Sequence, residues 1–452
     1  MEGKYIMRNS REIAMKILYE VNVKKAYSSI SVDKNLRANI NELDDLFIRE
    51  LVYGVLENLI FIDWIIKQYS KVRFSKISPI VKEILRMGIY QIIFMDRVPD
   101  SAACNESVKL AKKYSHKGTI GFVNGVLRTI SRNKKNIEIP DKKLEPIKYL
   151  SIKYSHPEWM IKRWIEEFGF EFTEQLCIAN NKKPKLNIRV NTLKISRDEL
   201  MKKFSNKGIQ VYETKYADDG IIVENPVRIT NTEEFNKGYF QIQDESSMLV
   251  GQVLNPKEDS LVLDVCSAPG GKTTHIAQKM NNKGKIIARD IHEHKLKLVE
   301  QNARRLGIDI INTEVFDALV LDTDLVGKID YCVVDAPCTG FGLIRRKPEI
   351  KYNRTLEDIK EINEIQYNIL KNSSCYLKQN GILVYSTCTI EKEENIKLIR
   401  RFLSENPMYK LVPIEEIRCD DIKISSKNGY IEFFPNIHGT DGFFIAKLIK
   451  IY

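Results

Sequence analysis

The 452-residue sequence has no long uncharged apolar run and no low-complexity tract. A membrane-spanning helix needs about 18 or more apolar residues in a row, and charged residues interrupt every apolar stretch here, including the N-terminal MEGKYIMRNSREIAMKILYE. That segment also lacks the apolar core of a signal peptide. The long polar or Pro/Gly-rich tracts of disordered chains are missing too. We therefore expect a fully folded cytoplasmic protein with no internal repeat.

The cysteines lack the spacing of a metal site. There is no CxxC pair, and no histidines stand where they would complete a zinc site. We therefore expect no bound metal. We expect the cysteines to be reduced thiols and mostly core residues: Cys104, Cys177, Cys266, Cys332, Cys338, Cys375, Cys388 and Cys419.

The composition is that of a globular protein with an uneven distribution of charge. Hydrophobic residues make up 43% and charged residues 29% of the chain, whose length calls for two or three domains. The net charge is +11, and residues 1–150 alone hold 27 Lys and Arg against 17 Asp and Glu. A basic N-terminal third is typical of a domain that binds a polyanion such as RNA. A general bias toward lysine explains the charge equally well.

The apolar pattern divides the chain into three parts. Apolar residues recur at helical spacing from residue 8 to about 135, and Ser78 with Pro79 forms a helix start. Residues 136–150 are polar, contain two prolines and have no clear period, which is typical of a linker. Residues 154–247 mix helical segments with short alternating runs such as LNIRVNTL and GIIVEN. The helical faces that this pattern predicts contain Ile13, Ile17, Leu18, Val21, Phe47, Leu51, Val55, Leu59, Ile84, Leu85 and Ile92.

From Leu261 onward, short strand-like runs alternate with segments of helix length. The runs are LVLDV, KIIARD, INTEVFD, YCVVDA and ILVYS, followed by the pair YIEFFP and FFIAKLI. Strands separated by helices predict a parallel, doubly wound sheet. The closing pair predicts an antiparallel hairpin that adds a reversed edge strand. We accordingly place domains at 1–140, 141–245 and 246–452.

The stretch Leu261–Thr274, LVLDVCSAPGGKTT, predicts a cofactor loop. A buried strand ending in Asp264, a loop of small residues and a following helix allow the backbone to approach a nucleotide-like ligand closely. The GKT fragment is similar to a phosphate-binding loop, but that motif needs glycine where Cys266 stands. We therefore set the phosphate-loop interpretation aside.

Two further aspartates follow the next two predicted strands. Asp290 ends the second strand, where a carboxylate can accept hydrogen bonds from ribose hydroxyls, and Asp317 follows the third. A single aspartate at such a place more often caps the next helix. Together with Asp264, however, they form a row at one rim of the sheet, which favours a ligand that carries a ribose.

Two cysteines occupy corresponding positions after neighbouring strands. Cys338 lies in DAPCTG after the fourth strand, and Cys388 lies in YSTCT after the fifth. A single free cysteine is usually a small buried hydrophobe. Two thiols delivered to the rim that holds the predicted cofactor loop favour a catalytic role, although the sequence pattern alone does not rank them.

These motifs resemble those of the Sun (RsmB-like) family of RNA cytosine-C5 methyltransferases. The resemblance rests on DVCSAPGGKT, the aspartate after the second strand, DAPCTG with the downstream RRKPEIKY, LVYSTCTI and DGFFIAKL, in that order over residues 240–450. ILRMGIYQIIF, CNESVKLAK and FVNGVLR are similar to the NusB-type helical RNA-binding domain. RVN, KGYF and QDESSM are similar to the family's connecting domain. Thr389 departs slightly, since the family often has serine there.

The resemblance implies a fold, a cofactor and roles for residues. The fold is an all-α NusB-like domain, a small α+β connecting domain and an α/β Rossmann-like class I methyltransferase domain. Cys388 is then the nucleophile, Cys338 assists product release, and Asp335 orients the base. S-adenosylmethionine would be bound by Cys266, Ser267, Ala268, Pro269, Gly270, Gly271, Lys272, Asp290, Asp317 and Asp335.

The implied chemistry explains why a thiol is needed. Cytosine C5 is a poor nucleophile, and addition of a thiolate to C6 places electron density on C5. The thiol pKa must be lowered locally, and the cationic cofactor together with nearby basic residues such as Arg345 could help to do this. The target base must also leave its stack. The implied partner is 16S rRNA, free or in an assembling subunit, and we expect a monomer.

Two other functions fit parts of the sequence. In a DNA cytosine methyltransferase the nucleophile follows a proline and would be Cys338, but the second thiol and the basic N-terminal part weaken that interpretation. A non-enzymatic RNA-binding or antitermination factor would need only the NusB-like part. The intact cofactor and cysteine motifs weigh against it.

Overall fold

The computed structural model describes residues 9–36, 41–224, 229–417 and 419–452. Contacts divide the chain into two compact units. The helical unit consists of residues 1–182 and 344–353, and the catalytic unit of residues 183–343 and 354–452. The predicted boundary at residue 140 therefore lies inside the helical unit, and the three-domain division stays a prediction.

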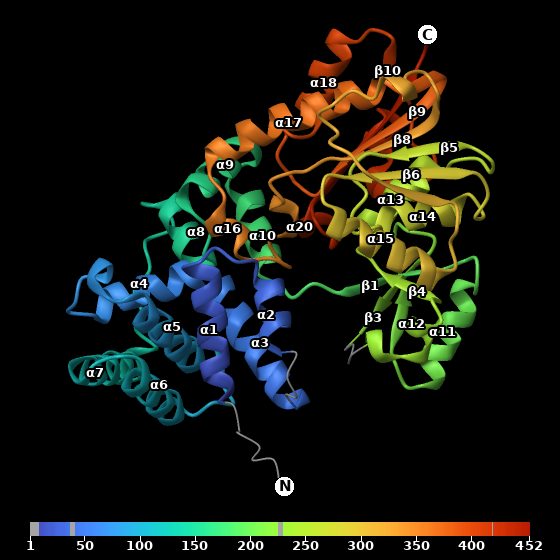
Figure 1. The fold of residues 1–452 in the computed structure, drawn as a ribbon. Coiled ribbons are helices and arrows are strands. Elements are labelled where there is room, and N and C mark those ends of the chain that lie inside the picture. The colour runs from blue at the N-terminus through green and yellow to red at the C-terminus, as the bar shows by residue number, and fades with distance from the viewer. Residues whose placement is uncertain (1–8, 37–40, 225–228, 418) are drawn as a thin grey trace. The chain divides into compact units, whose positions relative to one another are not determined.

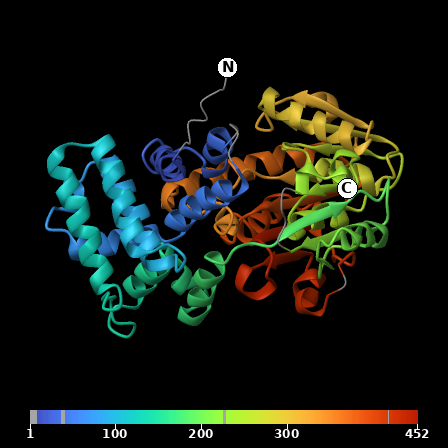
Figure 2. The same cartoon turned by 90° about the horizontal axis from the view of Figure 1, so that it is seen from below.

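In the helical unit, the apolar faces of α1 to α7 form one core. The predicted face residues Ile17, Leu51, Val55 and Ile84 are among its fully buried members, while Phe47 packs partly buried against it. Figures 1 and 2 show α6 and α7 side by side. Its helices are α1 (Ser10–Asn22), α2 (Ser28–Leu36), α3 (Glu42–Glu57), α4 (Leu59–Tyr69), α5 (Pro79–Phe94), α6 (Asp100–Tyr114), α7 (Lys117–Asn133), α8 (Pro146–Tyr154), α9 (Glu158–Phe168) and α10 (Phe170–Asn180).

A short segment from the C-terminal half of the chain completes the helical unit. Residues 344–353, which include α16 (Ile350–Asn353), belong to it. The buried ammonium of Lys351 donates to the backbone oxygen of Glu57 at 2.9 Å and to Asn181 at 3.3 Å. The Glu349 carboxylate accepts from the backbone and side chain of Ser28. Burial lowers the pKa of Lys351 to about 7. Nothing in the sequence pattern separates this segment from the domain around it.

The catalytic unit begins with a small antiparallel sheet in the order β2-β3-β1-β4. Its buried side chains, among them Ile188, Phe204 and Phe240, form a core of their own. The capping box of Ser196 and Glu199 starts α11. The elements are β1 (Leu186–Val190), α11 (Arg197–Asn206), β2 (Val211–Glu213), β3 (Gly220–Val223), α12 (Glu233–Asn236) and β4 (Phe240–Ile242).

The large sheet has the order β10-β12-β9-β8-β5-β6-β7, with β11 paired to β12. The strands from β9 to β7 in that order are parallel, and β10, β11 and β12 run antiparallel to their neighbours. The strands are β5 (Leu261–Asp264), β6 (Lys285–Asp290), β7 (Ile311–Val315), β8 (Ile329–Asp335), β9 (Leu377–Thr387), β10 (Tyr409–Leu411), β11 (Tyr430–Phe433) and β12 (Phe443–Lys450).

Helices cover both faces of this sheet because successive side chains of a strand point to opposite faces. On β8, Val333 joins one core, and Cys332 and Val334 join the other. Figure 1 shows α13, α14 and α15 on one side and α17 and α18 on the other. These helices are α13 (Glu245–Leu254), α14 (Gly271–Lys279), α15 (Glu293–Leu306), α17 (Leu356–Cys375) and α18 (Ile396–Glu405); the shorter α19 (Lys423–Lys427) and α20 (Pro435–His438) follow.

Most of the predicted architecture is confirmed, and three details are wrong. The reversed strand β12 lies between β9 and β10, so it is not at the edge. The predicted linker is irregular only up to residue 145, because α8 begins at Pro146. Only Cys104, Cys177 and Cys332 are buried, and the other five cysteines are partly exposed, although all eight are free thiols. Among the described residues, no helix is long and apolar enough to cross a membrane.

Gly54 of α3 provides a test of helical packing. A Cβ atom there would lie 2.0 Å from the ring of Tyr90. We expect Gly54→Ala to lower the free energy of unfolding by about 1–3 kcal/mol, despite the better helix propensity of alanine, because the core would be overpacked. Gly125→Ala is the control, since a Cβ there meets nothing within 4 Å, and it should raise stability by about 1 kcal/mol. If denaturant titration showed that both substitutions raise the free energy of unfolding equally, the packing argument would be contradicted.

Candidate active site

The parallel strands bring the predicted site residues to one rim of the large sheet. Asp264, Asp290 and Asp335 are the last residues of β5, β6 and β8. Cys388 directly follows β9. The carboxyl ends of parallel strands share one edge, which is where open α/β sheets bind ligands. Residues far apart in sequence therefore meet because of strand direction and order.

The glycine loop between β5 and α14 packs closely against its neighbours. Gly270 has a φ of +97°, a conformation that side chains disfavour. A Cβ on it would lie 3.0 Å from the Cα of Val299 on α15. The backbone N–H of Ser267 donates to the carbonyl of Arg289 at 2.8 Å, which ties the loop to β6. The small residues in the loop thus let its backbone stay close to the rim.

Two buried polar atoms at this loop fit a ligand. Asp264 is 1% exposed, and its Oδ2 accepts from the hydroxyl of Thr273 at 2.7 Å. Its Oδ1 and the Oγ of Ser267 have no hydrogen-bond partner within the described part of the chain. A buried polar atom without a partner is costly. A cofactor with a hydroxyl or ammonium donor would satisfy both atoms, so the residues present fit S-adenosylmethionine.

Asp290 and Asp317 each accept a hydrogen bond from the backbone two residues on. One oxygen of Asp290 accepts from the backbone of His292 at 2.9 Å, and one oxygen of Asp317 accepts from the backbone of Leu319 at 2.9 Å. Neither is a helix cap, because the N-caps of the helices that follow are His292 and Asp322. Each carboxylate has a second oxygen that can accept from a ligand, and the ligand role of both residues stays a prediction.

Lys272 and Asp335 form an ion pair next to the thiols. The ammonium of Lys272 lies 2.7 Å from Oδ2 of Asp335, and Ser386 donates to Oδ1 at 2.8 Å. Burial lowers the pKa of Lys272, but Asp335, with a smaller contribution from Cys388, raises it above its ordinary value. Lys272 is thus a cation in electrostatic reach of Cys388. The suggested contribution of Arg345 stays a prediction.

The two thiols are in contact. The Sγ atoms of Cys338 and Cys388 are 3.1 Å apart. Gly342 joins their loops, because its N–H donates to the carbonyl of Cys388 at 3.0 Å and its own carbonyl accepts from Gly442 at 2.9 Å. Gly442 lies in the DGFF motif, directly before β12. Through it, the antiparallel part of the sheet contacts the loops of both thiols.

Arg189 is a site residue that sequence reasoning missed, although RVN was noted. It is fully enclosed on β1, and it donates to the carbonyl of Gly271 and to the hydroxyl of Thr274 in the first turn of α14. Burial lowers its pKa to about 9. Arg189 thus attaches the small sheet to the helix of the glycine loop. An arginine amid apolar strand residues was the available signal.

Family models match nearly all of the chain. The model of 16S rRNA methyltransferase RsmB/F matches residues 251–449, the NusB family matches residues 8–132, and an RsmF/B-like ferredoxin-like domain matches residues 156–230. The probable ribosomal RNA small subunit methyltransferase B of Bacillus subtilis (strain 168) is 39% identical, over 97% of this chain and 98% of the relative. The chain belongs to the RsmB/F family of 16S rRNA methyltransferases. It is therefore an S-adenosylmethionine-dependent rRNA methyltransferase.

Solved structures of relatives support the same fold. The crystal structure of PH0851 covers 98% of this chain and 99% of its own, with 28% identity and a TM-score of 0.82. The structure of NSun6 from Pyrococcus horikoshii with SFG, an S-adenosylmethionine analogue, covers 64% of this chain and 97% of its own, with 27% identity and a TM-score of 0.58. The predicted NusB-like, α+β and Rossmann-like parts are confirmed.

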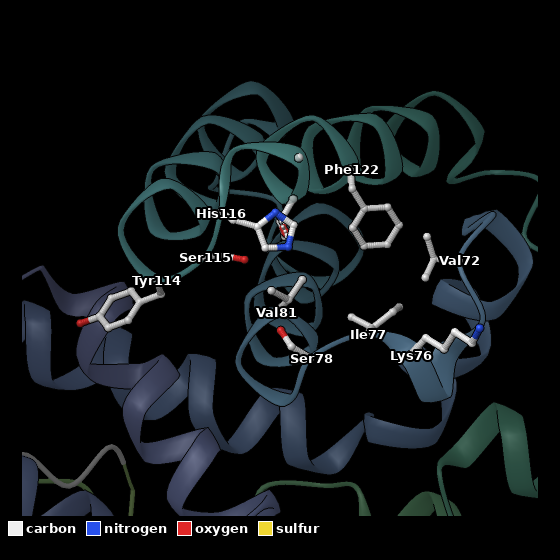
Figure 3. Close-up of a pocket in the computed structure, with 11 residues that line it drawn as sticks. Val72, Lys76, Ile77, Ser78, Val81, Tyr114, Ser115, His116 and Phe122 are labelled. Carbon is white, nitrogen blue, oxygen red and sulfur yellow. Dashed lines mark hydrogen bonds between the residues drawn. The ribbon is translucent and has the colours of Figure 1, made fainter.

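The helical unit of this family member has a pocket of about 520 Å³. Figure 3 shows His116 and Phe122 facing Ile77 and Val81 across it, with Lys76 at one side. Its lining combines apolar side chains with hydroxyl and basic groups. In the part of the chain that the structure describes, no group of His, Cys, Asp and Glu could hold a metal ion.

Asp264 should make stability depend on pH. Burial raises its pKa from 3.8 to about 7. The folded chain then binds more protons than the unfolded chain between these values, so the free energy of unfolding falls as the pH rises through this window. An asparagine at this position cannot titrate, so over this window the free energy of unfolding of Asp264→Asn should fall by up to about 4 kcal/mol less than that of the wild type, at about 1.4 kcal/mol per pH unit. Denaturant titrations of both cofactor-free proteins from pH 4 to 7 test this. If the free energies of unfolding of wild type and variant changed in parallel with pH, the prediction would be contradicted.

Gly342→Ala should disrupt the contact between the thiol loops. A Cβ on Gly342 would lie 1.8 Å from the carbonyl oxygen of Gly442 and 2.8 Å from that of Cys388. We expect methyl transfer to slow by about 100-fold, because small displacements of reacting groups are this costly. Gly121→Ala, where a Cβ meets nothing within 4 Å, is the control. Full activity of Gly342→Ala would show that the thiols do not depend on this contact.

Proposed function

We propose that the protein methylates C5 of a specific cytosine in 16S rRNA, with Cys388 as nucleophile, Cys338 in product release and Asp335 orienting the base. The observation that carries the proposal is the contact of the two thiols, 3.1 Å apart. They lie at the rim where the glycine loop and the ion pair of Lys272 and Asp335 are found.

The arrangement matches what C5 methylation of cytosine requires. The Cys388 thiolate bonds to C6, which turns C5 into a nucleophile. S-adenosylmethionine supplies the methyl group when it is bound. A base then takes the C5 proton, the C5–H electron pair forms the C5–C6 double bond, and the sulfur leaves C6 as the Cys388 thiolate, which frees the product. Cys338 lies within contact distance of the sulfur that must be released, and this supports its role in that step.

Asp335 is fixed before the substrate arrives. Ser386 and Lys272 donate to its two oxygens, so the carboxylate needs little reorganisation to hold the N3 edge of the base. Lys272 and the rest of the loop from Cys266, namely Ser267, Ala268, Pro269, Gly270 and Gly271, would hold the cofactor with Asp290, Asp317 and Asp335. The unpartnered atoms of Asp264 and Ser267 support that assignment.

The helical unit is suited to position the RNA. It contains the basic first third of the sequence, and phosphate contacts position an RNA without reading its sequence. Its pocket offers Lys76 and His116 beside the ring of Phe122. Because a thiol reaches C6 only when the base is unstacked, we infer a target in a loop or an extruded base. We infer a cytoplasmic monomer acting on free rRNA or an assembling subunit.

The substrate is tested by labelling four nucleic acids in parallel. The protein is incubated with methyl-labelled S-adenosylmethionine and unmodified small-subunit rRNA, large-subunit rRNA, tRNA or duplex DNA. We expect label as 5-methylcytosine at one small-subunit site. Label confined to another nucleic acid would refute the substrate, and label on another base would refute the chemistry.

Variants of the cysteines test the mechanism. We expect Cys388→Ala to lose methyl transfer by a factor of about 10⁴ or more, as nucleophile removal does in other covalent enzymes. Cys338→Ala should accumulate a covalent adduct with RNA that survives a denaturing gel. Cys375→Ala replaces a partly exposed thiol of α17 and is the matched control. Full activity of Cys388→Ala, or no adduct with Cys338→Ala, would overturn the respective role.

A further inference from the structure

A single buried carboxylate contacts both loops that carry the thiols. Glu394 is fully buried, just before α18. Its Oε2 accepts from the backbone N–H of Thr339 at 2.9 Å, and its Oε1 accepts from the hydroxyl of Thr339. The hydroxyl of Thr389 lies 3.2 Å from the same Oε1. Thr339 directly follows Cys338, and Thr389 directly follows Cys388, so Glu394 holds the residue after each thiol.

The donors around Glu394 indicate that it is ionised. Thr339 gives it an N–H and an O–H, and Gln366 gives it an N–H at 2.9 Å. Each of these groups can donate, and an ionised carboxylate accepts from all of them without a proton of its own. The hydroxyls of Thr339 and Thr389 are also 3.0 Å apart, so they form one hydrogen-bonded chain with the carboxylate.

The residues on the other side of each thiol are held by neighbours of Glu394. Gln366 donates its amide to the carbonyl of Pro337, before Cys338, at 2.9 Å. Asn395 accepts from the hydroxyl of Thr387, before Cys388, at 2.6 Å and donates to the carbonyl of Thr389 at 3.0 Å. The backbone on both sides of both thiols is therefore fixed by one buried group of side chains from α17 and the start of α18.

We propose that Glu394 is a positioning residue that fixes the Cys338 and Cys388 loops in register and places its negative charge beside Cys338. This rests on the proposed function, since it concerns the thiols of that reaction. This charge gives the chemically identical thiols of Cys338 and Cys388 different electrostatic surroundings. We attribute their different roles to this difference.

The electrostatics around Cys338 support this difference. The hydrogen bond with Cys388, burial, and the charges of Cys388 and Glu394 raise the pKa of the Cys338 thiol well above its ordinary value. The titratable groups that face this site also include Tyr385 of β9 and Glu391. Burial raises the pKa of Glu394 itself. A Cys338 that stays protonated can donate a hydrogen bond to a Cys388 thiolate, both before it adds to C6 and when it leaves C6 as the product is released.

The test compares Glu394→Gln with Glu393→Gln. The neighbouring Glu393 forms an i,i+4 ion pair with Lys397 at the surface, which makes it a matched control. Adduct formation with small-subunit rRNA is measured in a single turnover, with cofactor affinity and thermal unfolding alongside. We expect adduct formation to slow by about tenfold or more in Glu394→Gln, at unchanged cofactor affinity. Glu393→Gln should stay within about twofold, as expected for a surface site.

A second readout separates positioning from a merely structural role. In a Cys388→Ser background, the alkylation of Cys338 by iodoacetamide is followed against pH. Removing the charge of Glu394 should shift this profile to lower pH at an unchanged unfolding temperature, whereas loss of packing would lower the unfolding temperature as well. An unchanged profile together with an unchanged adduct rate in folded Glu394→Gln would overturn the proposal.

The threonines keep the proposal testable if Glu394→Gln does not fold. Thr339→Val and Thr389→Val remove only the hydroxyls that contact Glu394, whereas Thr339→Ser keeps the hydroxyl of residue 339. We expect both valine variants to slow adduct formation and the serine variant to form the adduct at close to the wild-type rate. Equal rates in all three would refute the positioning role. Wild-type protein that forms no 5-methylcytosine would instead refute the proposed function, so the two failures are distinguishable.

Discussion

The pairing of β8 with β9 is the constraint on which the site depends. The two strands are parallel and in a register that places Asp335 opposite Ser386. Cys338 and Cys388 follow at nearly equal distances from this pair, so their sulfurs meet at 3.1 Å. A slip of one residue would turn every side chain of a strand to the other face. The ion pair, the hydrogen bond of Ser386 and the contact of the thiols would all be lost together.

The buried charged side chains near this strand pair have specific hydrogen-bond partners. Asp335 has Lys272 and Ser386, Glu394 has two threonines and a glutamine, and Arg189 has the first turn of α14. Burying an ion is costly unless hydrogen bonds compensate. The compensation of Asp264 is incomplete, because one of its oxygens has no partner among the described residues and its pKa is raised to about 7, and Nε of Arg189 also has no partner there. Such incomplete compensation is typical of a site that awaits a ligand.

The helical unit includes one piece of the C-terminal half of the chain. Residues 344–353 follow the loop of Cys338 in sequence and pack within the helical unit through Lys351 and Glu349. Arg354, the next residue, belongs to the other unit and donates to the carbonyl of Thr339 at 3.2 Å, next to Cys338. The chain that follows the Cys338 loop thus belongs to the helical unit for ten residues before it returns.

The sequence by itself determined the strands, the helical faces, the glycine loop and both thiol motifs, because each is a local pattern with a fixed period or spacing. It did not determine which cation stands near Cys388, where β12 joins the sheet, or that Glu394 contacts both thiol loops. No local pattern pairs Lys272 with Asp335, and Glu394 is one of three glutamates within four residues. The partners of both residues depend on long-range packing that only the tertiary structure decides.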